Sequence, residues 1–315
     1  MDFVALPKIE LHAHLTGSIS RRVLHEIWHR KKEIGETLLD DPLTVMPQDK
    51  YDFSVESFFP LFSSYIYNLL TDECSIRYAT ASVLEHFLAD GVVYLELRTT
   101  PRATAHLSAE AYVRLLLDTI AAFEVGHAES MHTRLVLSID RRQTLESAEA
   151  TLELATRLRI EGHGVVGLDL CGDPSARPGG EVALFTPVFE KASSEGLGVT
   201  VHFAEAKASS SREELKTLLG WNPGRLGHVI WKDDESKMEI AQRGLCLELC
   251  LSCNVQAGMT DDVGVFGSPL SEEYRLVARY FNVNRTQLCN LARQGIDAIF
   301  GGEEEKQRLR DIMWS

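Results

Sequence analysis

The chain has 315 residues, of which 44% are hydrophobic and 25% are charged, a composition typical of a globular protein with a sizeable core. Acidic residues outnumber basic ones by 46 to 32, and the net charge of -14 opposes binding to nucleic acids and anionic membranes. We therefore expect no nucleic-acid or membrane partner, whereas a phosphorylated small molecule can still bind where a few arginines line a pocket.

The N-terminal residues do not resemble a secretory signal, because Pro7, Lys8 and Glu10 interrupt their apolar stretch. The six cysteines are spread along a chain far longer than disulfide-stapled miniproteins. We expect reduced thiols in a cytoplasmic protein, and a monomer.

Short strand-like runs alternate with helical patterns along the chain. Strands are predicted at 8–14, 92–98, 134–139, 165–170, 198–203, 225–230 and 245–250, and helices at 108–130, 144–161, 181–195 and 233–243. Ser108 and Thr144 are predicted helix caps, and 37–60 is predicted to be irregular. Strand–helix alternation predicts right-handed βαβ units and a parallel sheet, here in one domain over 1–315.

Polar residues at the predicted strand ends favour a closed barrel over an open doubly wound sheet. In a (β/α)8 TIM barrel the active-site groups come from the ends of many strands, whereas an open sheet gathers them at one switch point. Six successive predicted strands end at or just before His14, Arg98, Asp140, Gly172, His202 and His228. We therefore predict an α/β fold of the TIM-barrel type.

His12 and His14 are two apart in a strand, so their imidazoles face the same way and can chelate one ion. Taken alone, such a pair is more often coincidence or packing. His202 and Glu205 end the fifth strand, where they indicate a site or a surface salt bridge.

His228 ends the sixth predicted strand, and the adjacent carboxylates Asp261 and Asp262 indicate either a solvated turn or the end of an eighth strand. Three histidines and a carboxylate suit zinc, and one further histidine and acid remain for proton transfer.

Together these segments resemble the adenosine deaminase branch of the amidohydrolase superfamily, over nearly the whole chain. The matching segments are PKIELHAHLTGSI, DGVVYLELRTTPR, IDRR, VVGLDLCGDP, VHFAE, RLGH, LELCLSCNV and TDD. The ELRTTPR and IDRR segments are most similar to the adenosine deaminase-like proteins that act on N6-methyl-AMP. The resemblance implies a metal-dependent hydrolase barrel that converts N6-methyl-AMP to IMP and methylamine.

The resemblance also implies roles for individual residues. His12, His14, His202 and Asp261 would bind one zinc ion per chain, with His14 also bordering the substrate. Glu205 would protonate N1 of the purine, and His228 would orient and help to deprotonate the attacking water. The backbone of Gly172 and the carboxylate of Asp262 would bind ring nitrogens.

Thr16 favours a nucleotide over a nucleoside as substrate. The nucleoside enzymes have an aspartate at the matching position, and a carboxylate would repel a 5′-phosphate where a hydroxyl can donate to it. Thr99, Thr100 and Arg102 follow the second strand and offer further phosphate donors, unless Arg102 is a surface arginine. Asp140 is expected to orient these groups or the ribose.

The chain departs from the family between Asn254 and Thr260, where a long segment and most of the eighth strand are missing. Only 255–259 could form that strand, which is therefore expected to be short or incomplete. One alternative is an adenosine deaminase that acts on the nucleoside, and this departure adds a second, a catalytically impaired homologue. A binuclear amidohydrolase is disfavoured, because no lysine ends the fourth predicted strand.

Overall fold

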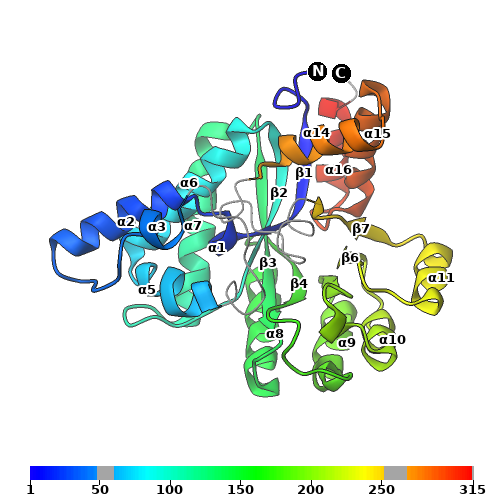
Figure 1. Ribbon diagram of the computed structural model, residues 1–315, viewed down its shortest axis with the longest axis horizontal. Helices are drawn as coiled ribbons and strands as arrows, with labels where there is room; N and C mark the ends of the chain where they lie inside the picture. Colours follow the sequence, from blue (N-terminus) through cyan, green and yellow to red (C-terminus); the bar gives the residue numbers. More distant parts are fainter. Residues whose placement is uncertain (48–59, 252–267, 314–315) are drawn as a thin grey trace.

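The computed structural model describes residues 1–47, 60–251 and 268–313. Within them, parallel strands pair strictly in chain order from β1 to β7 (Figure 1). The strands are β1 (Lys8–His14), β2 (Val92–Thr99), β3 (His132–Asp140), β4 (Val165–Cys171), β5 (Gly198–Phe203), β6 (Arg225–His228) and β7 (Cys246–Glu248). Neighbours in sequence are thus neighbours in the sheet, and the predicted α/β TIM-barrel fold is confirmed.

Helices connect and cover these strands. They are α1 (Leu15–Ser18), α2 (Arg21–Glu33), α3 (Pro42–Val45), η1 (Phe62–Ile66), α5 (Tyr67–Leu69), α6 (Glu73–Ala89), α7 (Ala109–His127), α8 (Leu145–Ile160), η2 (Glu181–Phe185), α9 (Thr186–Ser194), η3 (Lys207–Ser209), α10 (Arg212–Gly220), α11 (Asp234–Arg243), α14 (Leu270–Tyr280), α15 (Arg285–Ala298) and α16 (Glu303–Met313). Figure 1 shows α2, α6 and α7 on one flank of the strands and α9, α10 and α11 on another. The C-terminal helices lie beside β1.

The predicted caps function as the sequence indicates, since Ser108 and Thr144 each accept a hydrogen bond from the first turn of their helix. The predicted helix at 181–195 is instead two elements, the 3-10 turn η2 and the α-helix α9. Pro187 explains the division, because a proline fits only the first turn of a helix.

β6 ends at His228, two residues before the predicted end of that strand. His228 and Val229 adopt φ angles of +63° and +57°, which extended strands do not contain. The amide of Val229 donates to the carbonyl of Phe203 at 3.0 Å, so the chain turns back over the end of β5. This turn holds the His228 side chain at the mouth of the barrel.

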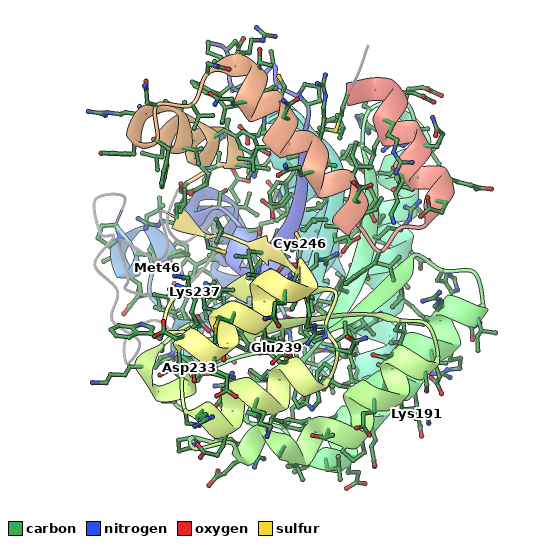
Figure 2. All side chains as sticks on the ribbon, turned by 90° about the vertical axis from the view of Figure 1, so that its right-hand side faces the viewer. Met46, Lys191, Asp233, Lys237, Glu239 and Cys246 are labelled. Atoms are coloured by element: carbon green, nitrogen blue, oxygen red, sulfur yellow. The ribbon has the colours of Figure 1, made fainter. Side chains whose placement is uncertain are left out.

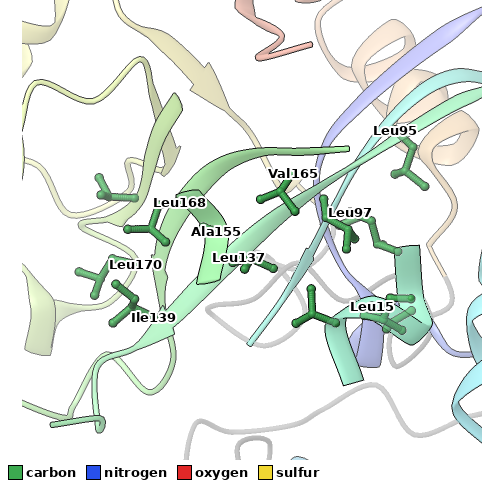
Figure 3. Close-up of a cluster of buried hydrophobic side chains, with 14 of the residues drawn as sticks. Leu15, Leu95, Leu97, Leu137, Ile139, Ala155, Val165, Leu168 and Leu170 are labelled. Atoms are coloured by element: carbon green, nitrogen blue, oxygen red, sulfur yellow. The ribbon is translucent and has the colours of Figure 1, made fainter. Parts of the chain in front are cut away.

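The strands have an apolar outer face and a polar inner face. In Figure 3, Leu95, Leu97, Leu137, Ile139 and other leucines of β2, β3 and β4 pack in the core that the helices cover. The alternating residues Glu96, Arg98, Ser138, Asp169, Thr200 and Arg225 are also fully buried. Since side chains alternate along a strand, these polar residues point into the barrel.

Phe300 packs against the end of the barrel opposite the histidines, where β5 begins at Gly198. A Cβ atom added at Gly198 would collide with its ring, and one added at Gly167 would lie 2.9 Å from it. The Phe300 amide donates to Glu96 at 2.6 Å, and the Arg225 guanidinium lies 3.7 Å from the ring centroid. The absence of side chains at Gly167 and Gly198 therefore leaves the space that the Phe300 ring occupies.

A cavity of about 690 Å³ lies between β1 and β7, lined by Ile9, Leu11, Cys246, Leu249 and residues of α14 and α15. Figure 2 views the side of the molecule on which Cys246 of β7 lies near α11. In a closed barrel the eighth strand would lie between β7 and β1. The segment predicted to form it, 255–259, falls outside the described residues. Among the described helices, none is long and apolar enough to span a membrane.

Candidate functional site

Three of the predicted metal ligands converge at the mouth of the barrel. Nε2 of His202 lies 3.2 Å from Nε2 of His12 and 3.1 Å from Nε2 of His14. The ligand atoms of all three side chains lie within 4.8 Å of one another. β1 and β5 thus bring together imidazoles that are 188 and 190 residues apart in sequence.

Hydrogen bonds at the other ring nitrogen fix the tautomers of His12 and His202. Nδ1 of His202 lies 2.8 Å from the carbonyl oxygen of Leu170, which can only accept, so this nitrogen carries the proton. Nδ1 of His12 lies 2.7 Å from the carboxylate of Glu248 and donates in the same way. In the neutral rings both Nε2 atoms then present lone pairs to each other.

Such facing lone pairs repel unless a cation lies between them. Two nitrogens bound tetrahedrally to zinc at ~2.0–2.1 Å are about 3.3 Å apart, close to the 3.2 and 3.1 Å that separate Nε2 of His202 from those of His12 and His14. The arrangement therefore fits a borderline metal such as zinc bound by three imidazoles.

A buried carboxylate lies against the Nδ1 atom of each of these two histidines, Glu248 beside His12 and Asp169 beside His202. Burial alone would raise the pKa of Glu248, but Arg98, Arg225 and His12 hold it well below its usual range. Burial likewise opposes ionisation of Asp169, whose pKa Arg98 and His202 hold below its usual range. Both groups are therefore anionic acceptors for the protonated Nδ1 atoms, an arrangement that commonly orients metal-binding histidines.

Glu205 and His228 lie beside the three histidines. Their side chains are buried, and Nε2 of His228 is 3.8 Å from a carboxylate oxygen of Glu205. The ring centroid of His228 lies 5.1 Å from that of His12 and 5.2 Å from that of His202. An acid and an imidazole thus border the same space, as proton transfer requires.

A second cavity, of about 570 Å³, opens at the ends of β2 and β3. Thr100, Arg102, Asp140, Arg142 and Tyr67 are among its lining residues. The guanidinium of Arg102 lies 4.5 Å from the ring centroid of Tyr67, and Arg142 makes a two-pronged ion pair with Asp140, at 2.8 and 2.5 Å. Two guanidinium groups in one cavity can bind an anionic group.

The remaining predicted site residues are placed in different ways. Gly172 packs its Cα against the Asp140 carboxylate, since a Cβ there would lie 2.7 Å from it. Thr16 lies half-buried in α1, directly after the histidine strand. Thr99 is not among the residues that line the cavity, and its hydroxyl forms a hydrogen bond with Tyr112 of α7 at 2.8 Å. Asp261 and Asp262 fall outside the described residues.

Sequence reasoning assigned no role to Asp169, Glu248 or Arg142, and it noted Arg98 only as a residue at a strand end. The available signal was charge inside apolar strands, as in LELR, LDLC and LELC. Charged residues are rarely buried unless they are paired, so each of these strands predicts a partner elsewhere in the barrel.

Comparisons with known proteins identify the family of the chain. The family model described as adenosine deaminase matches residues 7–260. The N6-mAMP deaminase of Arabidopsis thaliana is 33% identical, covering 98% of this chain and 96% of that protein. The human N6-methyl-AMP deaminase is 30% identical, covering 98% and 93%. The Arabidopsis comparison extends over 352 positions, more than the 315 residues of this chain, so the relative contains additional residues.

Solved structures match over the same extent. The crystal structure of the Arabidopsis N6-mAMP deaminase has a TM-score of 0.90 and 34% identity, covering 99% of this chain and 98% of that one. The Arabidopsis protein ADAL complexed with IMP has a TM-score of 0.89 at 34% identity, with 99% and 97% covered. The chain therefore belongs to the adenosine deaminase family of hydrolytic enzymes.

Proposed function

We propose that this enzyme is a zinc-dependent deaminase of 6-aminopurine nucleotides, and that it converts N6-methyl-AMP to IMP and methylamine. The observation that carries the proposal is the convergence of Nε2 atoms from His12, His14 and His202. Relatives named N6-methyl-AMP deaminase, and the related Arabidopsis structures complexed with IMP and GMP, support a purine nucleotide as substrate.

The three histidines would hold one zinc ion per chain, with Asp261 as the fourth ligand. Bound zinc would supply a nucleophile at neutral pH by lowering the pKa of water to ~7. The donor set supports this choice of metal, because neutral imidazole is a ligand that zinc favours.

Proton transfer would be carried by the two groups beside the histidines. Glu205 would donate a proton to N1 of the purine, since attack at C6 breaks the aromaticity of the ring and places charge on that nitrogen. His228 would accept the proton of the attacking water. Gly172 and Asp262 would bind ring nitrogens and orient C6 toward the metal.

The 5′-phosphate would bind in the cavity at the ends of β2 and β3. Arg102 and Arg142 supply positive charge there, and Thr100 supplies a hydroxyl. Arg142 is paired with Asp140, so a phosphate would compete with this carboxylate for the guanidinium. Thr16 would avoid the repulsion that a carboxylate at its position would cause.

Replacing Glu205 tests the assignment of the proton donor. Glu205→Gln should keep one zinc per chain by elemental analysis and lose deamination by at least about 100-fold in kcat, since a general acid contributes ~10²–10⁴-fold. Glu213→Gln, on the exposed side of α10, is the matched control and should retain full activity. Undiminished turnover by Glu205→Gln would refute the assignment.

Substrate preference tests the phosphate site. The protein should prefer N6-methyl-AMP and AMP to adenosine in an ultraviolet assay. Arg102→Gln and Arg142→Gln should each lower kcat/KM for the nucleotides by about 10–100-fold, because a hydrogen bond to a charged group is worth ~1.5–3 kcal/mol. Each variant should leave kcat/KM for adenosine unchanged. A wild-type preference for adenosine would overturn the nucleotide proposal.

The length difference from the relatives favours one competing possibility, a homologue that binds nucleotide without turning it over. Metal analysis and turnover distinguish the possibilities. One zinc with turnover supports the deaminase, two metals support a binuclear hydrolase, and no metal supports the impaired homologue.

A further inference from the structure

Arg98 lies at the centre of a buried ionic network beneath the three histidines. Its side chain is fully buried inside the barrel, and its two terminal nitrogens contact different carboxylates. Nη1 donates to Oδ1 of Asp169 at 3.1 Å, and Nη2 donates to Oε2 of Glu248 at 2.5 Å. One side chain of β2 thus links β4 with β7.

The same two carboxylate oxygens hold the imidazoles. Oε2 of Glu248 accepts from Nδ1 of His12 at 2.7 Å. Oδ1 of Asp169 lies 3.2 Å from Nδ1 of His202, which also donates to the Leu170 carbonyl at 2.8 Å. Each arm of the Arg98 guanidinium therefore contacts an oxygen that holds one histidine. The guanidinium is planar and rigid, so the positions of these two oxygens depend on each other.

We propose that Arg98 is a positioning residue that sets the spacing of His12 and His202 for the metal by bridging Glu248 and Asp169. The inference rests on the proposed zinc site. Its role differs from that of a general structural ion pair, because the bridge acts on the Nδ1 atoms and thereby orients both Nε2 atoms.

Other contacts keep this bridge in place. Nη2 of Arg98 also donates to the carbonyl oxygen of Leu11 at 2.9 Å, and Thr200 donates to Glu248 at 3.1 Å. Arg225 donates to the other oxygen of Glu248 at 2.5 Å and to Glu96 at 2.6 Å. The network thereby fixes Glu248 on β7 across the barrel interior, next to the side where the eighth strand is expected.

The bridge needs a side chain with two donors at a fixed separation. In Arg98→Lys the positive charge remains, but a single ammonium on a flexible stem cannot hold both carboxylates in the same geometry. We expect this variant to bind zinc about 10–100-fold more weakly in a chelator competition, the usual effect of losing a supporting contact to a metal ligand. In the cobalt-substituted protein, the visible absorption bands should change in position or intensity.

Arg141→Lys is the matched control. Arg141 is equally buried and ion-paired, here with Glu214 at 2.6 Å, and it contacts His202 only through the main-chain carbonyl at 3.4 Å. This variant should keep the wild-type zinc affinity and cobalt spectrum. An Arg98→Lys protein with wild-type affinity and spectrum would overturn the inference.

Two further variants apply if Arg98→Lys does not fold. Glu248→Gln and Asp169→Asn each alter one arm of the bridge, and each should weaken zinc binding and change the cobalt spectrum. Wild-type behaviour in both would overturn the inference. Failure of the wild-type protein to bind any metal would instead refute the proposed function, so the two failures are distinguishable.

Discussion

Gly172 shows how a single backbone position shapes the proposed substrate site. Its φ of +97° is a conformation that side-chain-bearing residues rarely adopt, and a Cβ would lie 2.7 Å from the Asp140 carboxylate. Gly172→Ala should lower the free energy of unfolding by about 1–3 kcal/mol from strain alone, with a further loss from the collision. Urea denaturation measures the change.

Gly162→Ala provides the comparison for that experiment. Gly162 has a similar φ of +85°, but a Cβ there would meet no atom within 4 Å. It should therefore show the strain without the collision. Equal losses in the two variants would mean that contact with Asp140 adds nothing.

At the level of residues, the sequence predicts the metal-binding histidines but not Glu248 and Asp169, which contact their Nδ1 atoms. Two imidazoles on one face of a strand follow from the spacing of His12 and His14 alone. The contact between His12 and Glu248 joins residues at opposite ends of the chain, and it depends on how β7 lies relative to β1. No local pattern contains that information.

Among the elements, α6 begins at a capping residue, Asp72, that also pairs with the buried side chain of Lys31. The Asp72 side chain accepts from the amide of Ser75 at 2.9 Å and forms an ion pair with Lys31 of α2. Burial alone would raise the pKa of Asp72, but these contacts hold it below its usual value. The pair therefore stabilises the fold above the unfolded-state pKa, and this contribution is lost as the pH falls through the lowered folded-state value.

Asp72→Asn separates the charge from the cap, because asparagine caps helices as well as aspartate does. We expect the variant to lose about 1 kcal/mol of unfolding free energy at pH 7, within the range of partly exposed ion pairs. The difference from wild type should shrink below about pH 4 as Asp72 is protonated. A difference that grows on acidification would contradict this explanation.

The element boundaries were predicted where local chemistry decides them. Ser108 and Thr144 mark their helices correctly, because capping depends on residues within one turn. The early end of β6 was not predicted, because the turn at His228 and Val229 depends on hydrogen bonds to the neighbouring β5 strand. A positive φ at a β-branched residue such as Val229 is not indicated by its sequence neighbours.

For the whole molecule, the proposed metal should contribute to stability as well as to chemistry. A ligand present at 100 times its dissociation constant stabilises the native state by about 2.7 kcal/mol. Removing zinc with a chelator should therefore lower the Tm by about 5 °C, and added Zn²⁺ but not Mg²⁺ should restore it. An unchanged Tm after complete zinc removal would contradict the metal site.

The barrel as a whole followed from the alternation of strands and helices and from polar residues at the strand ends. The pairing of the charged side chains did not follow, because the two charged residues of a strand such as VVYLELR do not show which side chains they face. Only the closure of the sheet makes Glu96 and Arg98 face other charged side chains. Burial of charge inside a barrel is a property of the assembled sheet.

Phe300 and Gly198 are in such close contact that neither can be replaced without regard to the other. Alanine at Gly198 would be accommodated only after Phe300 has been exchanged for a smaller residue, because both groups require the same space. The smaller residue would by itself leave a void under the strands and withdraw the aromatic face from Arg225. The alanine at Gly198 would thus be harmful alone but tolerated once Phe300 has been replaced. The order in which the two substitutions arise would decide whether the protein with one substitution folds.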